Sequence, residues 1–173
     1  MPTPRLIVVT GRPGSGKTTL AHALAREIRC PAICRDEIKE GVINTTEDAK
    51  APDDDIPRRV YDAFFDVVKL LLERNVTLVA EAAFQHKLWA PKLEPLRSIA
   101  DVRIVVCSID PQLARARRDA REFADAERAR FHPAWTDDEY DPPRFDVPTL
   151  TVNTSAGYLP ELPAITEFAR QSK

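Results

Sequence analysis

Residues 11–18 read GRPGSGKT, a full match to the pattern G-x-x-x-x-G-K-[ST]. Three of the chain's five glycines, Gly11, Gly14 and Gly16, fall within this short stretch. Such clustering indicates a local cause: several backbone N–H groups must turn inward around an anion, which requires tight or positive-φ backbone and no Cβ in the way. The pattern therefore predicts a loop that binds the phosphates of a nucleotide.

The expected nucleotide contacts come from this loop and from the start of the helix after it. Lys17 supplies a positive charge for the β- and γ-phosphates, and the Thr18 hydroxyl is placed to hold Mg²⁺. The positive end of the helix dipole adds to the attraction. The residues expected to bind ATP are Gly11, Arg12, Pro13, Gly14, Ser15, Gly16, Lys17, Thr18 and Thr19.

Strand-like and helix-like segments alternate along the chain. Residues 6–10 are apolar without alternation, which is typical of a strand covered on both faces. Further strands are expected at 32–34, 76–80, 102–109 and 149–152, and helices at 16–29, 36–42, 57–74, 86–99, from 110 onward and at about 160–170. This order predicts an α/β fold, namely a three-layer α/β/α P-loop NTPase whose five-stranded parallel sheet has the order 2-3-1-4-5. Its ligand is expected at the carboxyl ends of the strands.

Two helices carry more detailed expectations. The helix at 57–74 should bury an apolar stripe, and Pro91 and Pro95 should delay or kink the helix at 86–99. The stripe consists of Val60, Phe64, Val67, Val68 and Leu71. Asp110 followed by Pro111 is a favourable helix start, since a carboxylate caps free N–H groups and proline needs no partner in the first turn.

The composition fits a single domain over residues 1–173. A chain of 173 residues with 43% hydrophobic content can bury one core. No apolar run approaches the roughly 20 residues of a membrane span, and the N-terminus does not resemble a signal peptide, so we expect a cytoplasmic protein without a membrane partner. Cys30, Cys34 and Cys107 are odd in number and lie in or beside expected strands, which favours reduced thiols over disulfides or a metal site.

Asp36 follows the second expected strand, at the same sheet edge as the phosphate loop. An ionised carboxylate there could align an acceptor hydroxyl with the γ-phosphate and take its proton, so Asp36 is the candidate base. Alternatively, Asp36 only caps the short helix after it.

Glu81 ends the third expected strand. It could hold substrate or orient a water on Mg²⁺; alternatively, it faces solvent at the end of its strand. A charged side chain directly after an apolar strand favours a cleft. Gln85 lies a few residues further on and is a candidate for substrate binding.

The segment after Pro111 carries arginines at helical spacing, and the region at about 115–135 is a candidate lid. One or two of Arg115, Arg117, Arg118 and Arg121 are expected to neutralise charge on the transferred group. We assign Arg118 and Arg121 to catalysis and Arg117 to nucleotide binding. The alternative is an ordinary surface helix with ion pairs to the interspersed acidic residues.

Several segments together resemble one family. They are GRPGSGKTT, CRDEIKEGV, VAEAAF, SIDPQLARARRDAR and PTLTVNTSAGY. The set resembles the small P-loop kinases often described as AAA-type ATP-binding proteins, with chloramphenicol phosphotransferase, the zeta-toxin kinases and the 5′-kinase domain of polynucleotide kinases as relatives. The resemblance implies that Asp36 is the general base, Arg35 or Lys39 contacts the acceptor, and Arg118 or Arg121 belongs to the lid. That family often has Asp where this chain has Glu81.

Together these features predict a kinase that uses ATP and Mg²⁺ to phosphorylate a hydroxyl of a small molecule, acting as a monomer or homodimer. An alternative is a polynucleotide 5′-kinase. The formal charge of −2 and the pI of about 6.0 disfavour a partner held through many phosphates, but leave nucleic acid open. A second alternative is a nucleotide-gated binding protein. The sequence does not identify the acceptor, since acceptor pockets are built from loops whose residues follow no general pattern.

Overall fold

The computed structural model describes residues 3–45, 55–124 and 140–171. Its strands are β1 (Arg5–Gly11), β2 (Ala32–Cys34), β3 (Leu78–Glu81), β4 (Asp101–Ser108) and β5 (Thr149–Asn153). Its helices are α1 (Lys17–Ile28), α2 (Arg35–Asn44), α3 (Ile56–Glu73), α4 (His86–Leu93), the 3₁₀ helix η1 (Glu94–Ser98), α5 (Pro111–Ala124) and α7 (Leu162–Arg170). Residues 125–135 of the expected lid lie outside the described residues.

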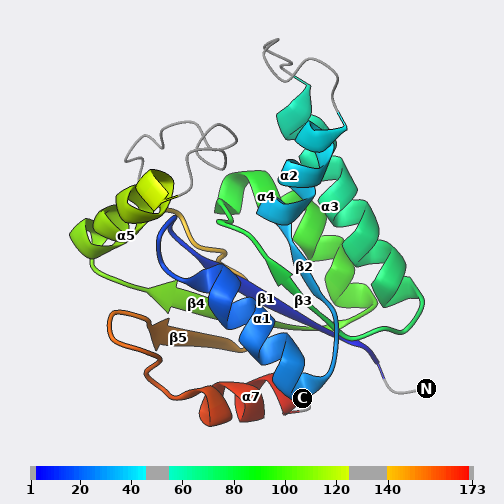
Figure 1. The fold of residues 1–173 in the computed structure, drawn as a ribbon. Coiled ribbons are helices and arrows are strands. Elements are labelled where there is room, and N and C mark those ends of the chain that lie inside the picture. The colour runs from blue at the N-terminus through cyan, green and yellow to red at the C-terminus, as the bar shows by residue number, and fades with distance from the viewer. Residues whose placement is uncertain (1–2, 46–54, 125–139, 172–173) are drawn as a thin grey trace.

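The five strands form one parallel sheet in the order β2-β3-β1-β4-β5, which confirms the predicted topology. Helices α1 and α7 cover one face and α3 and α4 cover the other (Figure 1). Side chains of β1 alternate between the two cores, with Leu6 and Val8 in one and Ile7 and Val9 in the other. Because both faces are covered, every residue of β1 from Leu6 onward is buried, as its unbroken apolar run predicts.

Several element boundaries differ from those expected, for local reasons. The third strand begins at Leu78 instead of Val76, because the Val76 N–H bonds to the Leu71 carbonyl and completes the end of α3. The expected helix at 86–99 begins without delay at His86, accommodates Pro91, and gives way to η1 at Glu94. Asp110 caps α5 as expected, since its Oδ1 accepts hydrogen bonds from the N–H groups of Gln112 and Leu113.

The buried stripe of α3 was predicted only in part. Val60, Phe64 and Val68 are buried, but Val67 is 37% exposed and Leu71 is half-buried. Phe65 and Leu72 are buried in their place. The stripe therefore lies slightly around the helix from its predicted position.

All three cysteines are free, and Cys34 and Cys107 are buried. Within the described residues no helix is both long and apolar enough to span a membrane.

The sheet brings the chemically active residues together. The carboxyl ends of β1, β2, β3 and β4 lead into the phosphate loop, α2, the segment after Glu81 and the approach to α5, respectively. Since the strands are parallel, these four ends lie at one edge of the sheet (Figure 1).

Candidate active site

The phosphate loop has the backbone that its glycines were predicted to provide. Gly14 and Gly16 have positive φ angles of 83° and 77°. A Cβ at Gly11 would lie 2.5 Å from the Ser15 hydroxyl and 2.8 Å from the Cys107 carbonyl oxygen. Nothing lies within 4 Å of where a Cβ at Gly16 would stand, so this position is open. The loop is thus shaped as an anion cradle.

Lys17 and Thr18, at the start of α1, both contact Glu81. The Lys17 Nζ lies 3.7 Å from Glu81 Oε1, and the Thr18 hydroxyl donates a hydrogen bond of 3.2 Å to Glu81 Oε2. Glu81 is only 1% exposed, which excludes the alternative of a solvent-facing carboxylate. Burial raises the pKa of Glu81, while the nearby Lys17 ammonium opposes that shift.

Residues at this position fit a magnesium ion bound through water. Glu81 Oε1 is buried and has no hydrogen-bond partner among the described residues, and the Thr18 hydroxyl is adjacent to the same carboxylate. Mg²⁺ prefers hard oxygen ligands and keeps several of its waters. Thr18 could therefore ligate the ion directly, and Glu81 Oε1 could accept a hydrogen bond from one of its waters.

The first turns of α2 present three charged side chains. Asp36 lies in the first turn of the helix, where its carboxylate is 3.4 Å from Arg35 Nη1. The N-cap position belongs to Cys34, so Asp36 is not the cap residue of the alternative interpretation. Lys39 lies one turn further along, and burial together with the neighbouring Arg35 lowers its pKa. All three side chains line one cavity.

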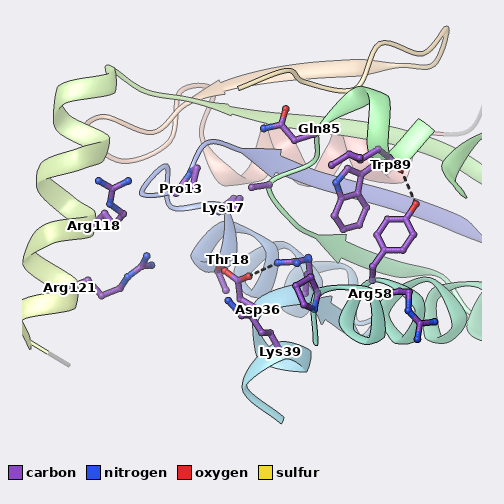
Figure 2. Close-up of a pocket in the computed structure, with 15 residues that line it drawn as sticks. Pro13, Lys17, Thr18, Asp36, Lys39, Arg58, Gln85, Trp89, Arg118 and Arg121 are labelled. Atoms are coloured by element: carbon purple, nitrogen blue, oxygen red, sulfur yellow. Dashed lines mark hydrogen bonds and ion pairs between the residues drawn. The ribbon is translucent and has the colours of Figure 1, made fainter. Parts of the chain in front are cut away.

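This cavity has a volume of about 660 Å³ and lies between the phosphate loop, α2, α3, α4 and α5. Figure 2 shows Arg118 and Arg121 reaching from α5 toward the phosphate loop, with Asp36 and Lys39 on α2 and Trp89 and Arg58 farther from α5. The lining comprises Pro13, Lys17, Thr18, Arg35, Asp36, Lys39, Pro57, Arg58, Tyr61, Ala83, Gln85, Leu88, Trp89, Arg118 and Arg121.

The arginines of α5 fall into two groups. Arg118 and Arg121 line the cavity, whereas Arg115 is exposed and does not. Arg117 points elsewhere: its Nη1 and Nη2 donate hydrogen bonds to the backbone carbonyls of Thr154 and Ser155, at 2.9 and 2.6 Å. Arg117 thus ties α5 to the turn after β5.

Gln85 and Glu81, the two other candidates, differ in whether they line the cavity. Gln85 lines it and also accepts a hydrogen bond from the Asp141 N–H through its Oε1. Glu81 does not line it and instead contacts Lys17 and Thr18. Among the ATP contacts predicted in the loop, Pro13 faces the cavity, and Thr19 lies exposed on α1.

The sequence interpretation missed the wall formed by α3 and α4. Arg58 and Tyr61 are one turn apart on α3, beside the apolar stripe, and Tyr61 donates a hydrogen bond to the Leu88 carbonyl. Trp89 packs edge-on against Phe84, with ring centroids 4.5 Å apart. An aromatic and an arginine next to an apolar helix stripe were the signal available in the sequence.

The fold and the cradle define a kinase-like P-loop NTPase. A sequence model of the AAA domain family matches residues 6–138, and the chain belongs to this family. The resemblance to small P-loop kinases is thereby confirmed. A search of curated proteins finds no match.

Solved structures share the fold at low sequence identity. A protein from Chloroflexus aurantiacus that is provisionally assigned as a kinase has a TM-score of 0.83 and 23% identity, with 98% of each chain covered. The APS kinase of Mycobacterium tuberculosis, solved with AMPPNP and APS, has a TM-score of 0.65 and 19% identity over 99% of this chain and 100% of that one. A chain of the Pnkp1/Rnl/Hen1 RNA repair complex has a TM-score of 0.59 and 19% identity over 70% of this chain and 39% of that one.

Proposed function

We propose that the protein is an ATP- and Mg²⁺-dependent phosphotransferase that moves the γ-phosphate to a hydroxyl group of a small molecule. This proposal rests on one observation, that the candidate base and the phosphate loop line the same cavity. Asp36, a half-buried carboxylate, lines the same space as Lys17 and Thr18 of the phosphate loop. An acceptor in that space would lie between the candidate base and the phosphate cradle.

The chain's residues have separate tasks in this reaction. The loop amides and Lys17 bind the β- and γ-phosphates, and Thr18 and Glu81 would hold Mg²⁺, which neutralises phosphate charge. Asp36 accepts a hydrogen bond from the acceptor hydroxyl and takes its proton as the new O–P bond forms. The bond between the γ-phosphorus and the bridging oxygen breaks, and ADP leaves with its electron pair. Arg118 and Arg121 approach the cradle from α5 and would stabilise charge on the transferred group.

Asp36→Asn tests the proposed base. The amide keeps the shape of the side chain but does not take a proton, so turnover should fall by about 10²- to 10⁴-fold while ATP affinity stays near that of the wild type. Asp66→Asn, an exposed carboxylate change on α3, is the matched control and should leave turnover unchanged. If Asp36→Asn retains full turnover on the true acceptor, the assignment of the base is wrong.

The acceptor is found by incubating the protein with Mg²⁺, ATP and hydroxylated metabolites, antibiotics and oligonucleotides, and measuring a mass gain of one phosphate. Phosphate gain on a small molecule supports the proposal. Efficient phosphorylation of 5′-hydroxyl ends of RNA or DNA would replace it with a polynucleotide kinase. ATP binding with no transfer to any acceptor, together with a large change in partner affinity on nucleotide exchange, would instead indicate a nucleotide-gated binding protein.

A further inference from the structure

A group of metal-ligating side chains lies outside the lining of the cavity. Among the described residues, His22, Cys34 and Glu37 bring an imidazole nitrogen, a thiol sulfur and a carboxylate oxygen within 4.8 Å of one another. His22 Nε2 lies 2.7 Å from Glu37 Oε1 and 3.6 Å from Cys34 Sγ. None of the three lines the cavity, and the proposed phosphotransfer gives none of them a task. The proposed reaction therefore leaves this grouping unexplained.

Three elements bring these side chains together. Cys34 ends β2 and is the N-cap residue of α2, and Glu37 lies in the first turn of that helix. Side chains at the N-cap and three residues later lie on the same side of a helix start. His22 comes from α1, which packs beside β2. The sequence favours reduced thiols over a metal site, because the third ligand comes from a separate element and joins the other two only in the fold.

The donor set suits a transition metal such as zinc. Zn²⁺ takes thiolate, imidazole and carboxylate ligands at about 2.3, 2.0 and 2.1 Å in tetrahedral geometry, whereas Mg²⁺ prefers oxygen ligands. Around a tetrahedral ion, these bond lengths place nitrogen and sulfur about 3.5 Å apart. That separation is close to the 3.6 Å between His22 Nε2 and Cys34 Sγ. Nitrogen and oxygen would be about 3.4 Å apart, so the Glu37 carboxylate has to withdraw by less than about 1 Å from its present 2.7 Å.

The group combines one buried ligand with access from solvent. Cys34 is 2% exposed, whereas the side chains of His22 and Glu37 are 43% and 49% exposed. An ion can thus enter between two side chains that have room to adjust, and the sulfur stays shielded from bulk water. A water molecule would complete the tetrahedron, as it does in zinc sites with three protein ligands.

The surrounding charge favours a cation at this position. Burial is the largest cause that raises the pKa of the Cys34 thiol. Three carboxylates, those of Glu81, Glu37 and Asp36, raise it further. The thiol is therefore protonated without a metal, and its proton leaves to solvent as the metal–sulfur bond forms. The same carboxylates that disfavour a thiolate on its own stabilise a divalent cation beside it.

We propose that His22, Cys34 and Glu37 bind a divalent transition-metal ion, with Zn²⁺ as the expected metal, at a site separate from the Mg²⁺ of the nucleotide. Because the ligands come from α1, β2 and α2, the ion fastens the helix after the phosphate loop to the helix that carries Asp36. This inference goes beyond the proposed function and does not depend on it.

The test uses Co²⁺ as a spectroscopic substitute for Zn²⁺. The full chain is titrated with Co²⁺ under nitrogen, with Mg²⁺ in excess to occupy sites made only of oxygen ligands. We expect one Co²⁺ ion per chain and a thiolate-to-cobalt charge-transfer band in the near ultraviolet, which Zn²⁺ then abolishes. Cys34→Ser should remove the band. Cys30→Ser, which changes a half-buried cysteine outside the group, should leave it in place.

His22→Gln and Glu37→Gln test the other two ligands without disturbing the core, since both side chains are partly exposed. Each should raise the Kd for Co²⁺ and Zn²⁺ by roughly 100-fold or more, because even outer contacts to a metal ligand are worth about 10- to 100-fold. Glu27→Gln, an exposed carboxylate change further along α1, is the matched control and should leave the Kd unchanged. Zn²⁺ should also raise the Tm of the wild type in a saturable way, and this shift should be lost in His22→Gln.

Two results overturn the inference. One is a Co²⁺ titration without a thiolate band. The other is a band that requires Cys34 but is unchanged in His22→Gln and Glu37→Gln, since the ion would then lie elsewhere against the thiol. None of these measurements involves turnover, so a metal site in a protein that phosphorylates nothing would refute the proposed function and leave this inference standing.

Discussion

Gly14→Ala tests whether the phosphate loop and α5 are packed as the structure shows. A Cβ at Gly14 would collide with the carbonyl oxygen of Ala114, which belongs to the first turn of α5. The residue also has a positive φ of 83°, which an L-residue adopts only with strain. Two penalties therefore add at this position.

The two penalties can be separated, because the chain offers controls that carry only one. Gly16 and Gly157 have φ angles of 77° and 93°, and a Cβ at either would have nothing within 4 Å. Alanine at these positions should cost about 1–2 kcal/mol of unfolding free energy from backbone strain. Gly14→Ala should cost that amount plus about 1–3 kcal/mol for overpacking against a helix backbone.

The assay is urea unfolding without nucleotide, so that phosphate contacts do not contribute. Since α5 must move to admit the methyl group, the NMR signals of Arg118 and Arg121 should also shift in Gly14→Ala and remain in place in Gly157→Ala. If Gly14→Ala is no less stable than both controls, the loop and α5 are not in contact as described, and the approach of these arginines to the cradle loses its support.

Three further outcomes are expected. Lys17→Ala should remove several kcal/mol of transition-state stabilisation, seen as a large fall in kcat/KM, because its ammonium is expected to contact the β- and γ-phosphates. Wild-type kcat/KM in this variant would contradict the cradle assignment. Arg117→Ala should lower the free energy of unfolding by about 1.5–3 kcal/mol for each hydrogen bond lost to Thr154 and Ser155. Arg118→Ala should instead mainly lower kcat. Chemical denaturation and steady-state kinetics measure these effects, and an equal loss of stability in both variants would refute the assignment of Arg117 to structure and Arg118 to catalysis. The pKa of Glu81 is raised by burial, so its contribution to stability is fully present below pH 4.5 and is lost as the pH rises through its folded-state pKa. The unfolding free energy of the wild type should accordingly fall relative to Glu81→Gln as the pH increases from 4.5, and parallel pH profiles would show that Glu81 is not buried as described.

The sequence predicted the fold almost completely, because its signals are local and redundant. The glycine pattern at Gly11, Gly14 and Gly16 specifies a loop between a strand and a helix, and the apolar run from Leu6 to Val9 needs a helix layer on each face. Once strands and helices alternate, right-handed crossovers restrict the sheet order to few choices. The start of β3 was less accurate, because a single backbone hydrogen bond, from the Val76 N–H to the Leu71 carbonyl, decides where α3 ends and the strand begins.

The site was predictable where a residue lies at a strand end or where residues repeat at helical spacing. Glu81 ends β3 and Asp36 follows β2 by two residues, so their edge of the sheet was evident, and Arg118 and Arg121 share a face of one helix. Tyr61 stands out beside the apolar stripe of α3, but no local pattern shows that α3 packs beside α4, and the place of Tyr61 in the cavity wall depends on that tertiary contact.

The electrostatics of the site link the phosphate cradle to the acceptor side. Glu81 lies 3.7 Å from Lys17. Burial is the main cause that raises the pKa of Glu81, Lys17 opposes it, and the Asp36 carboxylate raises the pKa further. Without nucleotide, Glu81 supplies the counter-charge that a buried lysine needs, which holds Lys17 in the loop before any phosphate arrives. A bound phosphate would then take Glu81's place as the partner of Lys17. Glu81 would keep its hydrogen bond from Thr18, and its Oε1 would be left without a partner, which suits a magnesium ion bound through water. On this reasoning metal and nucleotide should bind cooperatively, since each neutralises the charge that the other leaves unpaired.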